Sequence, residues 1–311
     1  MDPEHIHLTE EVDGKTIHLM YVEVWDGLYT AIGVRKPEGD GPFPTVLMAA
    51  GNGGEGMAWI RDAVRNRAYT MDRLVEAGFA CAWLRYRTEV ELGYNTGGKL
   101  VRDARQGREM FNRAPLEYED EIAVAEYLKT LSWVDGDRIG VIGMSHGGEM
   151  ALKITAEYHG LAAAVASEPA SHEFLALRPD DTAFVNEETG LRNIEEMQMA
   201  EVDKVRRRID MDVAKARIAS IQTPFLVMGR DEDHLQGIFR TSYELLVEAG
   251  KDAEWVSYDH DYHGYVFPIR GEDGHYILND VQIQAIDHVI VLCSRKLLTF
   301  HQKLLIPMTF E

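Results

Sequence analysis

A serine at position 145 carries the clearest chemical signal in the chain. Residues 143–147 read Gly-Met-Ser-His-Gly, a G-x-S-x-G pattern, and they lie between an apolar run at residues 138–143 and the start of a helical pattern at His146 or Gly147. A serine on a tight turn between a buried strand and a helix projects its hydroxyl clear of the backbone, and flanking glycines allow the two elements to approach closely. The pattern predicts that Ser145 is a nucleophile.

A serine hydroxyl needs a base that accepts its proton, and histidine is the usual one. Where this motif occurs on an α/β sheet, an acid and then a histidine follow the serine along the chain. His263 fits this order, because it lies in a loop just after the strand predicted at residues 254–258, and Gly264 gives that loop freedom to turn. We take His263 as the base and keep His260 as its competitor.

The acid that orients the histidine is expected just after the strand predicted at residues 223–229. Two aspartates, Asp231 and Asp233, are available there. The distance from the strand start at Pro224 favours Asp233, whereas the distance back from the end of the next helix favours Asp231. The acid's position is fixed by where the strand leaves the sheet, so we predict Asp233, with Asp231 as the alternative.

A tetrahedral oxyanion is stabilised by two hydrogen-bond donors. The first is predicted to be the backbone N–H of His146, which follows the nucleophile at the N-terminus of the helix. The second should come from the loop after the first parallel strand, at residues 50–54, where glycines let the main chain approach a substrate. We assign it to the backbone N–H of Asn52. The alternative is that this loop is an ordinary glycine-rich turn.

The same loop supports a rival interpretation. Gly51, Gly53 and Gly56 form a G-x-G-x-x-G pattern after a strand, as in dinucleotide-binding folds. In those folds a helix begins at the motif, but the next clear helical pattern here covers residues 71–77, and the following strand ends in Arg-Tyr-Arg rather than in a carboxylate. We therefore expect neither a cofactor nor a metal, and NADP binding is the alternative.

One more carboxylate lies where a pocket is expected. Glu168 directly follows the strand predicted at residues 162–167. It could contact a substrate, or it could form an ion pair with Arg85 or Arg87. The sequence leaves both interpretations open.

Hydrophobic patterns predict the elements that hold these residues. Two strands at residues 16–24 and 28–35 are joined by Asp26 and Gly27, a hairpin signal. Alternating strands and helices follow, which is typical of a mostly parallel sheet with helices on both faces. We predict an α/β fold in a single domain over residues 1–311. The further strands are predicted at residues 45–50, 79–86, 138–143, 162–167, 223–229 and 254–258, and the helices at residues 71–77, 119–131, 238–249 and 281–297.

Residues 171–218 interrupt this alternation with a charged segment, in which residues 194–214 are helical in pattern. An insertion between two core strands would lie over the carboxyl ends of the strands, where open α/β sheets bind ligands. We predict that this segment is a small helical lid.

The charge of the chain limits its partners. The sequence has 52 acidic and 32 basic residues, which gives a formal net charge of −20. Such a surface repels nucleic acids and anionic membranes, so we expect neither as a partner. Cys81 and Cys293 lie in apolar surroundings, and the first residues lack the features of a signal peptide, so we expect a cytoplasmic protein. Whether it forms a homo-oligomer is left open.

Residues 120–152, with their Val-Asp-Gly-Asp-Arg-Ile-Gly turn and Gly-Met-Ser-His-Gly-Gly segment, resemble the dienelactone hydrolase and prolyl oligopeptidase-like branch of the α/β-hydrolases. Residues 27–54 and 223–267 are similar to the same branch. The resemblance implies the α/β-hydrolase fold, with Ser145 as nucleophile, His263 as base and the aspartate at 233 or 231 as acid.

Two departures from these relatives bear on the substrate. Dienelactone hydrolases proper use a cysteine nucleophile, where this chain has Ser145, and prolyl oligopeptidases carry a large N-terminal propeller, for which the chain has no room. The sequence therefore favours a serine hydrolase that cleaves small-molecule carboxylic esters through an acyl-enzyme. The alternatives are an amidase, peptidase or acyltransferase with the same triad, and a non-catalytic binding protein on the same fold.

Overall fold

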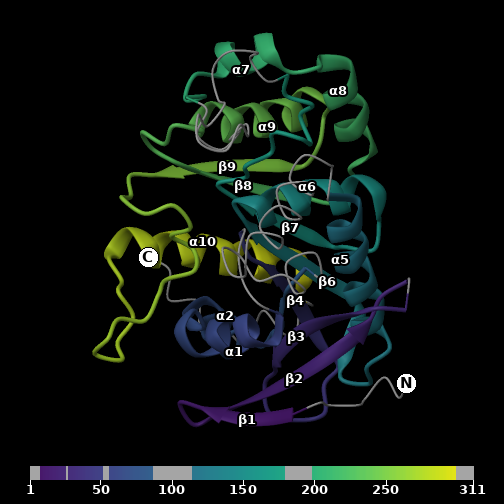
Figure 1. Ribbon diagram of the computed structural model, residues 1–311, viewed down its shortest axis with the longest axis vertical. Helices are drawn as coiled ribbons and strands as arrows, with labels where there is room; N and C mark the ends of the chain where they lie inside the picture. Colours follow the sequence, from purple (N-terminus) through teal and green to yellow (C-terminus); the bar gives the residue numbers. More distant parts are fainter. Residues whose placement is uncertain (1–7, 26, 52–55, 87–113, 179–197, 299–311) are drawn as a thin grey trace, which may run out of the picture.

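A large mixed sheet forms the centre of the molecule (Figure 1). The computed structural model describes residues 8–25, 27–51, 56–86, 114–178 and 198–298, and the elements below are those of this part of the chain. The strands are β1 (Leu8–Val12), β2 (Lys15–Glu23), β3 (Tyr29–Arg35), β4 (Phe43–Ala49), β5 (Ala80–Leu84), β6 (Val134–Met144), β7 (Ala163–Ser167), β8 (Phe225–Arg230) and β9 (Ala253–Tyr258). The helices are α1 (Gly56–Asn66), α2 (Tyr69–Glu76), α5 (Ala114–Lys129), α6 (His146–Glu157), α7 (Val202–Arg208), α8 (Met211–Ser220), α9 (Gln236–Glu248) and α10 (Asp280–Leu297).

The strand order is β1-β2-β3-β5-β4-β6-β7-β8-β9. The pairs β1/β2, β2/β3 and β3/β5 are antiparallel, and every pair from β5 to β9 is parallel. The predicted mostly parallel sheet with an N-terminal antiparallel hairpin is thus confirmed. Because β6, β7, β8 and β9 are neighbours and run in one direction, their carboxyl ends meet along the same edge of the sheet.

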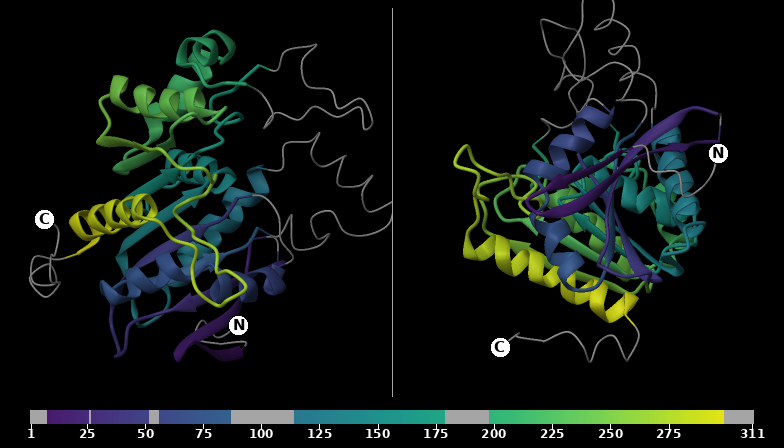
Figure 2. Two further views of the ribbon diagram at one scale, coloured as in Figure 1. Left: turned by 90° about the vertical axis from the view of Figure 1, so that its left-hand side faces the viewer. Right: turned by 90° about the horizontal axis from the view of Figure 1, so that it is seen from below.

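Helices cover both faces of the sheet, with α1, α2 and α10 on one side and α5, α6, α8 and α9 on the other (Figures 1 and 2). The central strands are therefore buried on both sides and read as continuous apolar runs. In β4, Val46 and Met48 pack into the core under α1 and α10, while Leu47 and Ala49 pack into the core under α5 and α6.

Three elements differ from the sequence prediction. The short strand β1 was not predicted, because its mostly exposed, polar residues lack a hydrophobic pattern. Helix α1 was not predicted either, and it begins at Gly56, directly after the glycine-rich loop. The helical pattern at residues 194–214 is not one helix: α7 ends at Arg208, and the side chain of Asp210 caps α8 by accepting a hydrogen bond from the N–H of Val213.

The predicted lid is described only in part, because residues 179–197 lie outside the described residues. Its described helices join the layer on one face of the sheet, where α7 packs on α9 and α8 packs on α6 (Figure 1). Whether the segment covers the carboxyl ends of the strands stays a prediction.

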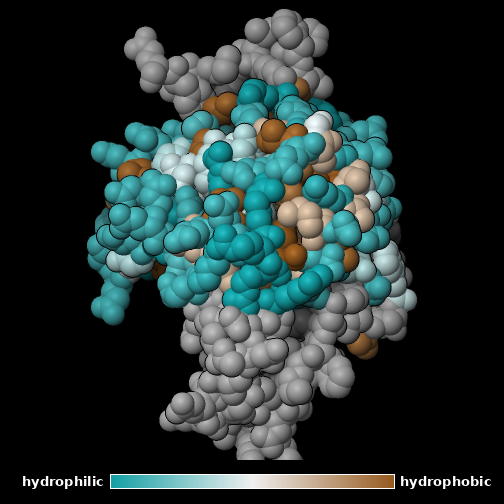
Figure 3. Space-filling model, turned by 90° about the horizontal axis from the view of Figure 1, so that it is seen from above, coloured by the Kyte–Doolittle hydropathy of each residue, from teal (hydrophilic) through white to brown (hydrophobic). Residues whose placement is uncertain are grey.

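The face formed by α7, α8 and α9 is mostly hydrophilic, and its apolar residues stand in small separate groups (Figure 3). None of the helices in the described part of the chain combines the length and the apolar character that a membrane span requires.

Backbone segments pack tightly around the turn between β6 and α6. A Cβ atom placed on Gly143 would lie 1.9 Å from the carbonyl oxygen of Gly147. A Cβ atom placed on Gly147 would lie 2.2 Å from the carbonyl oxygen of Ala49, at the end of β4. Backbone atoms cannot rotate away as side chains can, so both positions require glycine for lack of space.

We expect the substitution Gly143→Ala to lower the free energy of unfolding by about 3 kcal/mol, because the added methyl group meets backbone and forces the strand and the helix apart. Urea denaturation measures this loss. Gly136→Ala in the same strand is the control, since the atom nearest to its Cβ would be Cγ of the flexible side chain of Lys129, at 3.3 Å. Equal losses in the two variants would contradict the packing argument.

Candidate active site

Ser145 occupies a strained turn between β6 and α6. Its backbone angles, φ 55° and ψ −116°, lie outside the regions that non-glycine residues usually adopt. Such strain costs of order 1–3 kcal/mol and persists where the surroundings over-determine it. Here the N–H of Ser145 donates to the carbonyl of Ser167 over 2.9 Å, and its own carbonyl accepts from the N–H groups of Glu149 and Ala170, each over 3.1 Å. The turn predicted from the sequence is present.

Of the two residues predicted to bind an oxyanion, His146 lies in the described part of the chain and Asn52 does not. His146 is the first residue of α6, where backbone N–H groups have no partner inside the helix. Its side chain is buried, and Nε2 lies 2.6 Å from Oε2 of Glu117. Asn52 lies outside the described residues, so its role stays a prediction. Gly51 precedes it and runs beside the nucleophile, since a Cβ atom at Gly51 would lie 3.4 Å from the Cβ atom of Ser145.

One argument against the rival dinucleotide interpretation, that no helix begins at the glycine motif, was wrong, because α1 begins at Gly56. Arg85, the first arginine of the Arg-Tyr-Arg run after the motif, is fully buried, and its guanidinium donates a hydrogen bond to the carbonyl of Gly51 over 3.0 Å. Arg85 therefore supports the backbone of the loop next to Ser145. Arg87 lies outside the described residues.

His263 lies in the loop after β9. Gly264 follows it with a φ of +86°, and a Cβ atom there would lie 2.3 Å from Sδ of Met144, the residue before Ser145. The histidine loop therefore packs directly against the nucleophile turn. The competitor His260 faces its own loop, because its Nδ1 accepts a hydrogen bond from the N–H of Tyr262 over 3.0 Å.

Asp233 and Asp231 take opposite directions from the loop after β8. Oδ2 of Asp233 lies 3.5 Å from Nδ1 of His263, and the aspartate is fully buried. The carboxylate of Asp231 instead accepts a hydrogen bond from the hydroxyl of Ser257. Glu232 between them has a φ of 60°, a left-handed conformation that turns the chain. The structure thus brings Asp233, and not Asp231, to the histidine.

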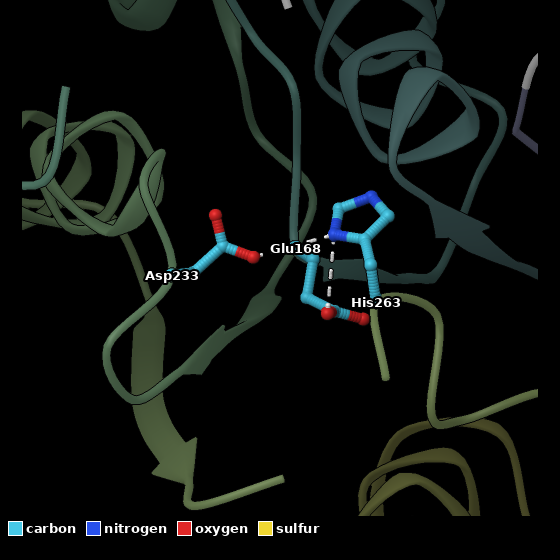
Figure 4. Close-up of side chains that lie close together, drawn as sticks. All are labelled: Glu168, Asp233 and His263. Carbon is cyan, nitrogen blue, oxygen red and sulfur yellow. Dashed lines mark ion pairs between the residues drawn. The ribbon is translucent and has the colours of Figure 1, made fainter. Parts of the chain in front are cut away.

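Glu168 also reaches His263, although we had expected it to contact a substrate or to pair with Arg85 or Arg87. Its Oε1 lies 3.3 Å from Nδ1 of His263, so two carboxylates face the same ring nitrogen (Figure 4). The other ring nitrogen, Nε2, points away from both acids (Figure 4). Glu168 is fully buried and has a φ of 48°, a second strained non-glycine residue beside the nucleophile.

Arg230, the last residue of β8, was missed by sequence reasoning. Its guanidinium donates to Oδ2 of Asp233 over 2.6 and 2.9 Å, and its Nε lies 3.6 Å from Oε1 of Glu168. It also donates to the carbonyls of His260 and Asp261, over 3.1 and 3.3 Å. One cation therefore balances the two acids and holds the histidine loop. The sequence offered one signal for Arg230: it is a single arginine between the predicted strand and the two aspartates.

This arrangement changes the acidity of both partners. Burial alone would raise the pKa of Asp233, but hydrogen bonds from His263, from the N–H of Leu235 and from Arg230 outweigh it and lower the pKa to about 2. Burial alone would lower the pKa of His263, but the interactions of its ring with the carboxylates of Asp233 and Glu168 outweigh this effect and raise the pKa to about 9. The imidazolium is strongly favoured, which makes His263 a strong base.

The same three side chains could hold a metal ion, since the ligand atoms of Glu168, Asp233 and His263 lie within 4.8 Å of one another. The guanidinium of Arg230 contacts both carboxylates, however, and would repel a second cation. We therefore interpret the cluster as a hydrogen-bonded group around the histidine.

Helix α6 is also fastened to the beginning of the predicted lid. Oε1 of Glu149 accepts the backbone N–H groups of Glu173 and Phe174, each over 2.8 Å. Nζ of Lys153, one turn further along α6, lies 2.7 Å from Oε2 of Glu173. Two side chains of the nucleophile's helix thus hold the chain where residues 171–218 leave the core.

The sequence profile of the prolyl oligopeptidase family matches residues 69–275. None of the curated proteins is similar enough to count as a match.

Solved structures share the fold. A putative dienelactone hydrolase from Klebsiella pneumoniae is 15% identical with a TM-score of 0.58, and the alignment covers 90% of this chain and 99% of that one. A thermostable carboxylesterase from a metagenomic library is 18% identical with a TM-score of 0.59, over 95% and 91% of the two chains. Dipeptidyl peptidase 4 from Porphyromonas gingivalis is 19% identical with a TM-score of 0.61, over 91% of this chain but 36% of that one.

The raised pKa of His263 links its proton to stability. Folding raises this pKa from the ordinary value of 6.5 to about 9, so the stabilisation is complete below pH 6.5 and is lost as the pH rises through about 9. We expect the stability advantage of the wild type over His263→Gln to shrink across this window. Urea denaturation at intervals of pH measures it, and an advantage that stays constant would contradict the raised pKa. Asp233, with its pKa of about 2, stays ionised throughout.

Proposed function

The chain belongs to the prolyl oligopeptidase family, within the α/β-hydrolase superfamily, and from this premise we propose that it cleaves small-molecule carboxylic esters through an acyl-enzyme on Ser145. His263 is the base, Asp233 is the acid, and the backbone N–H groups of His146 and Asn52 bind the oxyanion. No cofactor or metal takes part in the proposed reaction.

In the proposed mechanism Nε2 of His263 takes the proton from the hydroxyl of Ser145, whose oxygen attacks the ester carbonyl carbon. The carbonyl oxygen becomes an oxyanion and accepts hydrogen bonds from the donors at the start of α6 and in the loop after β4. The carbon–oxygen bond to the alcohol breaks, and the imidazolium returns its proton to the departing oxygen. Water then repeats the sequence on the acyl-enzyme and releases the acid.

One observation carries the proposal: Nδ1 of His263 faces the buried Asp233 at 3.5 Å, in a loop that packs on Met144 beside the strained Ser145. A histidine held by an acid through Nδ1 keeps its proton there, so that Nε2 is free to act as the base. A binding protein has no need of this arrangement, and the backbone strain at Ser145 would bring it no advantage.

Two further observations favour esters over amides. Of the three solved structures named above, the carboxylesterase and the putative dienelactone hydrolase are matched over nearly their whole length, whereas 36% of the peptidase is matched. In addition, a histidine with a pKa of about 9 is a strong base but a weak acid. Amide cleavage requires protonation of the departing nitrogen, whereas an alcohol, above all a phenol, leaves more readily without it.

We expect the purified protein to hydrolyse p-nitrophenyl esters with kcat/KM at least about 100-fold higher than for the matching p-nitroanilides of the same acyl groups. Ser145→Ala should lose this activity, because alanine has no hydroxyl oxygen to which the acyl group can become attached. A fluorophosphonate probe should become attached to Ser145, as peptide mass spectrometry can show.

Phosphonate labelling that persists in Ser145→Ala would refute the nucleophile. Faster cleavage of the anilides would instead favour an amidase or peptidase with the same triad. Inertness of the folded protein toward all esters and toward the phosphonate would favour a binding function.

The choice of acid is tested by a matched pair of variants. Asp233→Asn should lower kcat by at least about 100-fold, because the amide cannot stabilise the imidazolium; loss of the sole acid in related triads costs about 10⁴. Asp231→Asn, two residues away, should change kcat by less than about threefold, since its side chain contacts Ser257 rather than His263. Ester hydrolysis at saturating substrate measures both, and the reverse order would exchange the assignments.

A further inference from the structure

Glu168 is a charged group beside His263 that the proposed mechanism does not use. Its Oε1 lies closer to Nδ1 of His263 than does Oδ2 of Asp233, at 3.3 Å against 3.5 Å. Figure 4 shows the ring nitrogen between the two carboxylates, one from the end of β7 and the other from the loop after β8. A triad requires one acid, so the second needs an explanation.

The two oxygens of Glu168 have different partners. Oε2 accepts the backbone N–H of Gly264 over 2.7 Å, which fixes the residue next to the histidine. Oε1 has no hydrogen-bond donor at close range in the described part of the chain, and besides His263 it faces only Nε of Arg230, at 3.6 Å. A fully buried carboxylate oxygen in this position lacks compensation until the histidine offers an N–H or a positive charge.

The negative charge of Asp233 is compensated by more hydrogen bonds than that of Glu168. Its Oδ2 accepts two hydrogen bonds from Arg230, over 2.6 and 2.9 Å, and its Oδ1 accepts the N–H of Leu235 over 2.7 Å. The arginine neutralises much of the negative charge that a triad acid would otherwise offer to the imidazolium. Glu168 therefore supplies negative charge that Asp233, tied to Arg230, cannot supply alone.

We propose that Glu168 is a positioning residue that shares the Nδ1 proton of His263 with Asp233, so that the base has two acidic partners. The inference rests on the proposed function. When Nε2 takes the proton of Ser145, the Nδ1 proton stays on the ring and the new positive charge lies between both carboxylates. No further bond forms or breaks.

Other titratable groups around the cluster take part in its charge balance. Arg230 contacts both acids, and Nδ1 of His234 lies 3.3 Å from Oδ1 of Asp233. Tyr265 donates its hydroxyl to the carbonyl of Gly229, and burial raises the pKa of that phenol well above its usual range. Tyr265 therefore keeps its proton in the pH range in which His263 titrates.

The test is the pH dependence of the rate at which a fluorophosphonate labels Ser145, which does not require the natural substrate. In the wild type the rate should rise as His263 loses its proton. Glu168→Gln removes one of the two charges that favour the protonated ring, so the rise should move to lower pH by about one unit. The plateau should fall about three- to tenfold, because the base is weaker and less firmly oriented.

A purely structural role would lower the plateau without moving the rise along the pH axis. Glu254→Gln is the control for the change in net charge, because Glu254 lies on β9 with its carboxylate paired to Arg295. This control should leave both the plateau and the position of the rise unchanged.

A double-mutant cycle adds a second measurement. If the two acids share one proton, each single variant keeps one partner for the ring, and Asp233→Asn with Glu168→Gln should lose more than the product of the single losses. A loss in the double variant equal to the product of the two single losses would contradict the shared proton.

Should Glu168→Gln fail to fold, the proposal is tested in Asp233→Asn, where the His263 ring can be titrated by NMR. With Glu168 as second partner the pKa of His263 stays above 6.5 in this variant, and a value at or below 6.5 would overturn the proposal.

The labelling experiments distinguish a failure of the proposed function from a failure of the role of Glu168. Labelling that survives Ser145→Ala overturns the proposed function. Labelling confined to Ser145, with the same pH dependence in the wild type and in Glu168→Gln, overturns the role of Glu168 alone.

Discussion

The close approach between the start of α6 and the ends of β4 and β6 constrains everything around Ser145. Gly143 and Gly147 allow backbone atoms to meet where a Cβ would not fit. The serine is thereby driven into an unfavourable backbone conformation, and hydrogen bonds to Ser167 and Ala170 on the next strand and its loop hold it there. Glu168 lies between those two partners, so one short segment fixes both the nucleophile and an acid beside the histidine.

The electrostatics of the site follow from burial as much as from charge. Two carboxylates without access to water would be unfavourable alone, and Arg230 compensates mainly Asp233. The histidine completes the balance when it is positively charged, which is the state that it reaches after taking a proton from a hydroxyl. The cluster thus favours the charge distribution that an acyl transfer creates. It does so in a protein whose sequence has more acidic than basic residues.

Local patterns made much of this predictable. The Asp-Gly hairpin, the buried strands and the serine turn depend on neighbours in the sequence, and each appears where it was expected. Helix α1 was not predicted because it begins directly after a segment rich in glycine, and β1 was not predicted because an exposed edge strand has no apolar pattern. The choice between Asp231 and Asp233 depends on the left-handed backbone at Glu232, which composition does not reveal.

The contacts of Glu168 and Arg230 could not be read from the sequence for a different reason. They join residues more than sixty positions apart, at the ends of β7 and β8, and become neighbours only through the strand order. Once β7, β8 and β9 are known to lie side by side, the meeting of Glu168, Arg230 and His263 at one edge follows from the parallel direction of the strands.

The link between Glu149 and the chain at Glu173 and Phe174 has a consequence for how such proteins diversify. The same helix directly follows Ser145 and, one turn later, binds the beginning, or root, of the segment at residues 171–218. Exchanging or reshaping that part while keeping its root would leave the reactive centre anchored. A shift of the backbone at Glu173 or Phe174 would instead leave the buried carboxylate of Glu149 without these donors, so we expect changes in the segment to be tolerated better beyond Phe174.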